Sequence, residues 1–132
     1  TDVQFQQVRK MNTWLAVFLG GGAGSLLRYA ISRGVLSLAL RASFPWATLA
    51  SNLLATVLLA YVMIRMHAHL PGREHWMALL AIGFCGGFST MSTFNFENYQ
   101  LMRDGFYGFA AMNILVSVLA GLLIFYFFAR TT

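Results

Sequence analysis

The residues best suited to chemistry lie in one apolar stretch in the second half of the chain, where glycines are followed at once by hydroxyl side chains. This stretch, Gly83–Glu97, contains two adjacent glycines and then four Ser or Thr residues within five positions. Glycine in a helix interior costs about 1 kcal/mol relative to alanine, and hydroxyls can satisfy the backbone groups that a helix break leaves free. Because unwound backbone offers carbonyls to cations and hydroxyls offer hydrogens to anions, the stretch is a candidate ion site.

The same glycines allow a second interpretation. Gly83 and Gly87 have the G-x-x-x-G spacing that lets two membrane helices pack closely without any break. The pattern alone favours neither a break near the bilayer midplane nor a packing face on a continuous helix.

Two further apolar stretches each carry a row of neutral polar side chains on one helical face. Thr48, Asn52 and Thr56 are spaced four residues apart, and Asn113 and Ser117 repeat that spacing nearer the C-terminus. Such rows either join helices, with hydrogen bonds worth about 0.6 kcal/mol each, or line a pore. Together with the hydroxyl-rich stretch, they favour a polar path through the protein.

Groups for acid–base, nucleophilic or metal chemistry are sparse in these stretches. Glu97 lies only at the exit of one of them, and no Ser-His-Asp, Cys-His or paired-carboxylate arrangement is present. His67, His69 and His75 cluster around one loop, where we expect solvated side chains, and Cys85 is expected to be a small apolar residue. The sequence therefore predicts passive permeation or a structural role, not an enzyme or a proton-coupled transporter.

Four apolar stretches must position these side chains. The chain of 132 residues is 58% hydrophobic and only 10% charged, whereas soluble domains carry about 25% charged residues. Four charge-free intervals can cross a bilayer as helices, namely Met11–Leu27, Ala42–Ile64, His75–Phe96 and Gly105–Ala129. The first qualifies only if Arg28 lies at its edge or in a cavity. We expect one all-α membrane domain over residues 1–132, in which residues 1–10 are a polar native leader or an artificial extension.

The net charge of +5 is distributed as in a membrane protein. Basic residues lie at or near the ends of the apolar stretches, and not in a patch suited to nucleic acid. With four spans, the side of the two termini carries Arg9, Lys10, Arg65, Arg73 and Arg130. The opposite side carries Arg33, Arg41 and Arg103, and also Arg28 if this residue is counted as flanking the first span. This near balance allows both membrane orientations and hence an antiparallel homodimer, although a fixed topology stays equally open.

The glycine-rich segment Gly20–Gly24 resembles a phosphate-binding loop only superficially. No Lys-Ser/Thr pair follows it and no strand precedes it, so the nucleotide-binding interpretation lacks its context. We expect close helix packing or a local bend instead. Arg28, four residues later, would then lie near the mouth of a vestibule, where it would attract anions.

Taken together, these residues resemble the Fluc fluoride channels, also called the CrcB family, over residues 11–130. Gly20–Tyr29 is similar to the family's glycine-rich first span, and Thr48–Asn52 to its G-T-L-x-x-N element, with Ala47 where Gly is usual. Gly83–Glu97 is similar to the long signature G-F-C-G-G-x-T-T-F-S-T-F-x-x-E.

The resemblance implies an antiparallel, dual-topology homodimer of four-helix subunits in the lipid bilayer of a bacterial inner membrane, with the third helix broken. It implies two pores that pass fluoride out of the cytoplasm, reject chloride and require no other protein partner. It also implies a structural sodium ion at the dimer centre, held by backbone carbonyls of Gly86 and Ser89 from both subunits.

A fluoride pathway follows from the resemblance and from the polar rows. Fluoride holds its water tightly, so a selective pore must replace hydration with closely spaced neutral donors. Met91 stands where the family has a second phenylalanine, whose positive ring edge would face the anion, and Ser89 replaces the usual Thr. The expected pathway residues are Asn52, Met91, Ser92, Thr93, Phe94, Asn113 and Ser117.

Two other functions stay open at this point. A small dual-topology exporter of cations would need a membrane-embedded Glu in the first span, and Met11–Leu27 has none. A purely structural subunit of a larger membrane complex would show no transport alone. Fluoride efflux by the purified protein distinguishes the channel from both.

Overall fold

The computed structural model describes residues 2–37, 44–65 and 73–130, and within these ranges all regular structure is helical. In the described part of the chain, four helical segments are long and apolar enough to cross a membrane, namely Asn12–Leu36, Trp46–Arg65, Glu74–Arg103 and Tyr107–Arg130. The prediction of an all-α membrane protein with four spans is therefore confirmed.

The first span is longer than the charge-free interval suggested. The first helix begins at Asp2 and continues through Arg28 and Arg33 to Ser37. Arginine is a good helix former, so a charge that limits an apolar window does not end the helix. Residues 2–10 are continuous with this helix, while His67, His69 and Arg41 lie outside the described residues.

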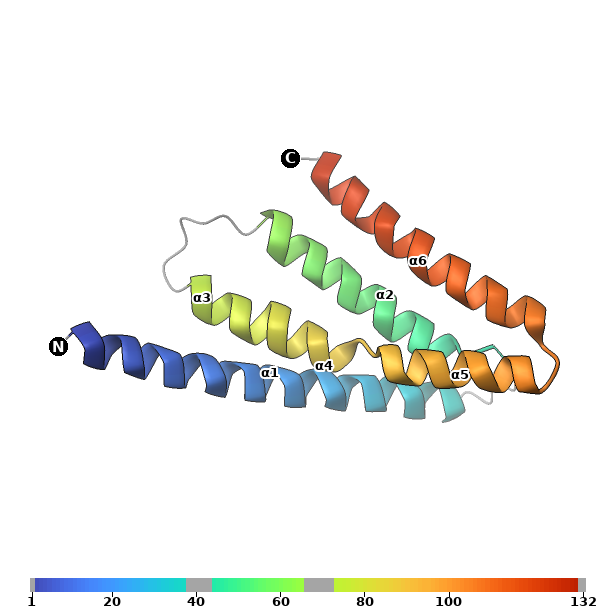
Figure 1. Ribbon diagram of the computed structural model, residues 1–132, viewed down its shortest axis with the longest axis horizontal. Coiled ribbons are helices and arrows are strands. Elements are labelled where there is room, and N and C mark those ends of the chain that lie inside the picture. The colour runs from blue at the N-terminus through green and yellow to red at the C-terminus, as the bar shows by residue number, and fades with distance from the viewer. Residues whose placement is uncertain (1, 38–43, 66–72, 131–132) are drawn as a thin grey trace.

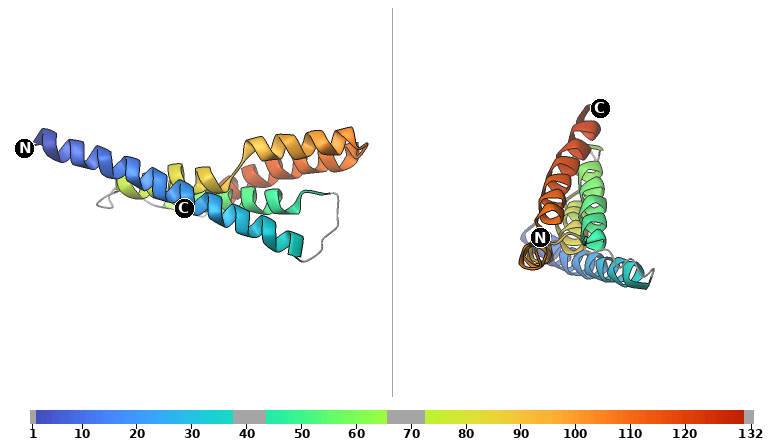
Figure 2. Two further views of the ribbon diagram at one scale, coloured as in Figure 1. Left: turned by 90° about the horizontal axis from the view of Figure 1, so that it is seen from below. Right: turned by 90° about the vertical axis from the view of Figure 1, so that its right-hand side faces the viewer.

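The spans alternate in direction. In chain order the elements are α1 (Asp2–Ser37), α2 (Trp46–Ala60), the π-helical η1 (Tyr61–Arg65), α3 (Arg73–Trp76), the π-helical η2 (Met77–Cys85), α4 (Gly86–Phe88), α5 (Met91–Arg103) and α6 (Tyr107–Arg130). Figure 1 shows α1 and the third span, from α3 to α5, running one way, with α2 and α6 running the other. In Figure 2, α2 and α6 lie side by side, and α1 crosses the third span apart from α6.

Glycines bring α1 and the third span into backbone contact. A Cβ added at Gly24 would overlap the carbonyl oxygen of Phe84, and one at Gly87 would overlap the carbonyl oxygen of Gly21. A Cβ at Gly83 would lie 2.8 Å from the carbonyl oxygen of Val17. The predicted G-x-x-x-G packing face is thus present, because only glycine allows these two backbones to approach so closely.

A tight turn reverses the chain between α5 and α6. Gly105 has φ +87°, a left-handed conformation that favours glycine. Its N–H donates to the Met102 carbonyl at 3.1 Å, and the Phe106 N–H donates to the Leu101 carbonyl at 2.7 Å. This pair of hydrogen bonds is a Schellman motif, which ends α5 and directs α6 back along it.

Large apolar side chains cover much of the outer surface. Trp14 is 78% exposed and Phe18 76% exposed on α1, and Leu122 is 64% exposed and Phe127 61% exposed on α6. An apolar surface of this extent indicates faces that meet lipid or another protein chain.

Candidate ion site

The third span leaves helical geometry at two consecutive residues between α4 and α5 (Figure 1). Ser89 has φ −83° and ψ 155°, and Thr90 has φ −151° and ψ 118°, so both are extended. The Ser89 N–H and hydroxyl donate to the Cys85 carbonyl at 2.9 and 2.7 Å. The Thr90 hydroxyl oxygen accepts the Thr93 N–H at 3.2 Å and caps α5. Hydroxyl residues thus satisfy the backbone on both sides of the extended segment.

Asn52 of α2 holds the extended segment from across the helix pair. Its amide oxygen accepts the Thr90 N–H at 2.8 Å, and its amide nitrogen donates to the Thr90 carbonyl at 3.4 Å. Thr56 in turn donates its hydroxyl hydrogen to the Asn52 carbonyl at 2.7 Å. Asn52 therefore supplies Thr90 with partners that a continuous helix would otherwise provide. This role of Asn52 was not predicted from the sequence, because it depends on a contact between residues far apart in the chain.

Arg28 lies beside α4. Its Nε donates to the Gly87 carbonyl at 3.2 Å, and the Ser25 hydroxyl lies 3.5 Å from the same oxygen. A cation beside carbonyls at the C-terminal end of a helical segment is favourable because the segment's dipole is negative there. Arg28 thus supports the backbone just before the extended residues, and its position at a vestibule mouth stays a prediction.

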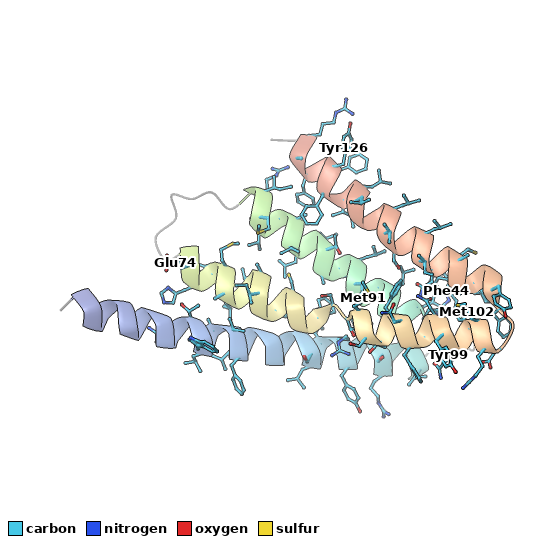
Figure 3. The ribbon with its side chains drawn as sticks, in the orientation of Figure 1. Phe44, Glu74, Met91, Tyr99, Met102 and Tyr126 are labelled. Atoms are coloured by element: carbon cyan, nitrogen blue, oxygen red, sulfur yellow. The ribbon has the colours of Figure 1, made fainter. Side chains whose placement is uncertain are left out.

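A cavity of about 290 Å³ adjoins the extended segment, between α2, α5 and α6. Met91 lies at its rim with 69% of its surface exposed, whereas Phe94 is only 9% exposed. Figure 3 shows Met91 at the start of α5. The cavity brings together four of the predicted pathway residues. Its lining residues are Asn52, Thr56, Ser89, Thr90, Met91, Phe94, Ser117 and Val118.

Three predicted pathway residues lie outside this lining. Ser92 is exposed and Thr93 is half-buried on α5. Asn113 is fully buried, where its amide donates to Asn98 Oδ1 at 2.7 Å and its Oδ1 lies 3.4 Å from the Ser117 hydroxyl. Asn113 therefore joins α6 to α5 and orients Ser117. Asn98 was not predicted as a site residue, and its only signal in the sequence is its position four residues after Phe94, on the same face of α5.

The two residues of the expected sodium site line a second, smaller recess of about 160 Å³. Gly86 and Ser89 share this recess with the buried Cys85, and apart from neighbouring backbone of the same helix no described atom lies within 4 Å of a Cβ added at Gly86. In a continuous helix the Thr90 N–H would donate to the Gly86 carbonyl, but it is bound to Asn52 instead. The Gly86 carbonyl thus lacks its helical partner, which fits a backbone ligand for a small hard cation.

Glu97 lies outside the two recesses described above, at the end of the molecule where α5 turns into α6. Its Oε1 accepts the Thr48 hydroxyl at 2.7 Å, and its Oε2 is buried without a partner among the described residues. It adjoins a cavity of about 370 Å³ that includes Phe44 and Asp104, and Figure 3 shows Phe44 at that end of the molecule. The Thr48 end of the predicted polar row therefore meets Glu97, and the Asn52 end meets the extended segment.

Comparison with known proteins identifies the family of this chain. A family model described as CrcB-like protein, Camphor Resistance (CrcB), matches residues 15–128. The protein called fluoride-specific ion channel FluC in Geobacter sulfurreducens is 41% identical over 109 residues, which are 82% of this chain and 86% of its own. Its namesake in Pyrococcus abyssi is 39% identical over 109 residues, which are 83% of this chain and 86% of its own. That of Pyrococcus furiosus is 43% identical over 104 residues, which are 79% of this chain and 82% of its own. The family resemblance predicted from the motifs is confirmed, and the chain belongs to the CrcB family.

Proposed function

We propose that this protein is a fluoride-selective, passive ion channel of the inner membrane that carries fluoride out of the cytoplasm and catalyses no reaction. One observation carries the proposal, namely the cavity lined by uncharged polar side chains beside the extended segment Ser89–Thr90. The similar proteins named fluoride-specific ion channels support the choice of ion.

The chemistry of the cavity suits a small anion. Among the described residues that line it, amide and hydroxyl groups and the ring of Phe94 are present, and none carries a formal charge. Neutral donors can replace the water of a small anion without binding it so tightly that it cannot leave. A lining without titratable groups also favours passive flow over proton-coupled transport.

The same proposal includes an antiparallel homodimer with one pore in each subunit. Each copy carries one such cavity, so two copies provide two pathways. The near balance of Lys and Arg across the four spans permits both orientations in one membrane. The exposed apolar surfaces of α1 and α6 offer area for a second copy as well as for lipid.

A sodium ion at the dimer centre completes the proposal, held by the Gly86 and Ser89 carbonyls of both copies. When bound, its positive charge would interact favourably with the partial negative charges of these carbonyl oxygens and so join the two subunits. Because the ligands are backbone atoms, Ser89→Ala should retain the ion, whereas Gly86→Val should lose it by filling the recess. Replacing sodium on both sides by N-methylglucamine should slow fluoride flux or weaken the dimer. If neither the rate of fluoride flux nor the stability of the dimer depends on sodium, the proposed sodium site is refuted.

Fluoride efflux from liposomes tests the function itself. The purified protein alone is reconstituted, the vesicles are loaded with potassium fluoride, and valinomycin is added to balance the charge. We expect rapid efflux of fluoride and none of chloride under the same conditions. Absence of fluoride efflux would contradict the channel and favour a structural subunit or a small exporter of cations.

Substitution of Met91 tests the rim of the cavity. Met91→Phe should conduct as well as the parent or better, because it adds a ring whose positive edge can face the anion near Phe94. The initial rate of fluoride efflux at matched protein density measures the effect. Blocked transport in a folded Met91→Phe protein would show that the pathway does not pass this rim.

A further inference from the structure

Most hydroxyl hydrogens around the 290 Å³ cavity are already donated to the protein. The Thr56 hydroxyl donates to the Asn52 carbonyl at 2.7 Å, and the Ser89 hydroxyl donates to the Cys85 carbonyl at 2.7 Å. The Ser117 hydroxyl is directed to Asn113 Oδ1 at 3.4 Å. A hydrogen that is donated to a carbonyl cannot also solvate an anion, so these three groups are not free donors in this arrangement.

Thr90 differs from the other hydroxyl residues of the cavity. Its oxygen accepts the Thr93 N–H at 3.2 Å, which fixes the position of the oxygen. Within the described ranges, its own hydroxyl hydrogen has no hydrogen-bond acceptor. An oxygen that already accepts one hydrogen bond is polarised and becomes a better donor. Asn52 has the other free donor, because only one of its two amide hydrogens is directed to Thr90.

We infer that the Thr90 hydroxyl binds the permeating anion in this cavity, as a specificity-determining donor beside the Asn52 amide. The inference rests on the proposed fluoride pathway and names the group that would replace part of the ion's water. The hydroxyl needs no rearrangement of the protein to donate, whereas Ser117 and Thr56 would first have to give up existing bonds.

The experiment compares three substitutions at Thr90 in the reconstituted full chain. Initial rates of fluoride efflux are measured over a range of fluoride concentrations, together with thermal unfolding of each protein in detergent. Thr90→Ser retains the cap and the donor and should behave like the parent. Thr90→Val removes both and should raise the half-saturating fluoride concentration about tenfold or more, as expected for a lost hydrogen bond to a charged group.

Thr90→Asp keeps a side-chain oxygen that can cap α5 but removes the hydroxyl donor. Aspartate is a strong N-cap, so the helix start should remain folded, but its carboxylate has no hydrogen to donate and repels the anion. We expect a folded protein with no measurable fluoride flux. Parent-like flux in this variant would count against the inference even if Thr90→Val is not recovered as a folded protein.

Parent-like flux in Thr90→Asp would overturn the inference. So would a folded Thr90→Val protein that melts at lower temperature but keeps the parent's half-saturating concentration, because Thr90 would then be a cap only. A parent protein that passes no fluoride would instead refute the proposed function, so the two failures are distinguishable.

Discussion

Replacement of Asn52 by aspartate is expected to abolish fluoride flux while the protein still purifies in its folded, proposed dimeric form. The carboxylate can still accept the Thr90 N–H, so the extended segment keeps its closer contact with α2. It cannot donate, however, and it places a negative charge beside a passing anion. At an effective dielectric constant near 20, like charges about 4 Å apart repel by roughly 4 kcal/mol. A barrier increase of that size lowers a rate by about a thousandfold.

The matched control makes the same chemical change away from the cavity. Asn12 is exposed near the start of the first span, so Asn12→Asp should leave the rate of fluoride efflux close to that of the parent. Both variants are compared by liposome efflux and by size-exclusion chromatography. Normal conduction by Asn52→Asp would place the pore elsewhere.

The second large effect concerns the contact between α1 and the third span. Gly24→Ala should lose most of the folded protein, because the added methyl would overlap the Phe84 carbonyl and lie 2.7 Å from the Phe88 backbone nitrogen. A backbone neighbour cannot rotate away as a side chain can. We expect the free energy of unfolding to fall by roughly 3 kcal/mol or more, which is the upper end of the usual cost of overpacking a core.

The matched control is the same substitution two residues earlier. Apart from neighbouring backbone of α1 itself, no described atom lies within 4 Å of a Cβ added at Gly22. Gly22→Ala should therefore be neutral or slightly stabilising through its better helix propensity. Yield and thermal unfolding in detergent measure both proteins. Equal stability of the two variants would show that α1 does not pack as described.

The spans and the polar faces could be predicted because they depend on local patterns. A charge-free stretch of about 20 residues is long enough to cross a bilayer as a helix, whatever the arrangement of the other helices. Likewise, the four-residue spacing places Asn52 and Thr56 on one face, and that face does line the cavity with Phe94 and Ser117. Both facts follow from helix geometry alone.

The partners of individual side chains could not be predicted, since they depend on how the helices pack. The charge of Arg28 suggested a vestibule, but α1 continues past it and places it against the Gly87 carbonyl. The two interpretations of the glycines were also not exclusive. Gly87 faces α1, whereas Gly86, about 100° around the helix, faces an open recess. Only the three-dimensional structure shows which glycine packs against α1 and which one faces the recess.

The central claim is passive, fluoride-selective conduction by this chain alone, and the reversal potential tests it most directly. The purified protein is placed in a planar bilayer with a fluoride gradient and equal chloride on both sides. The account predicts a steady current that reverses at the equilibrium potential of fluoride and does not shift when a proton gradient is added. A reversal potential set by chloride, sodium or protons, or no current from active protein preparations, would contradict it.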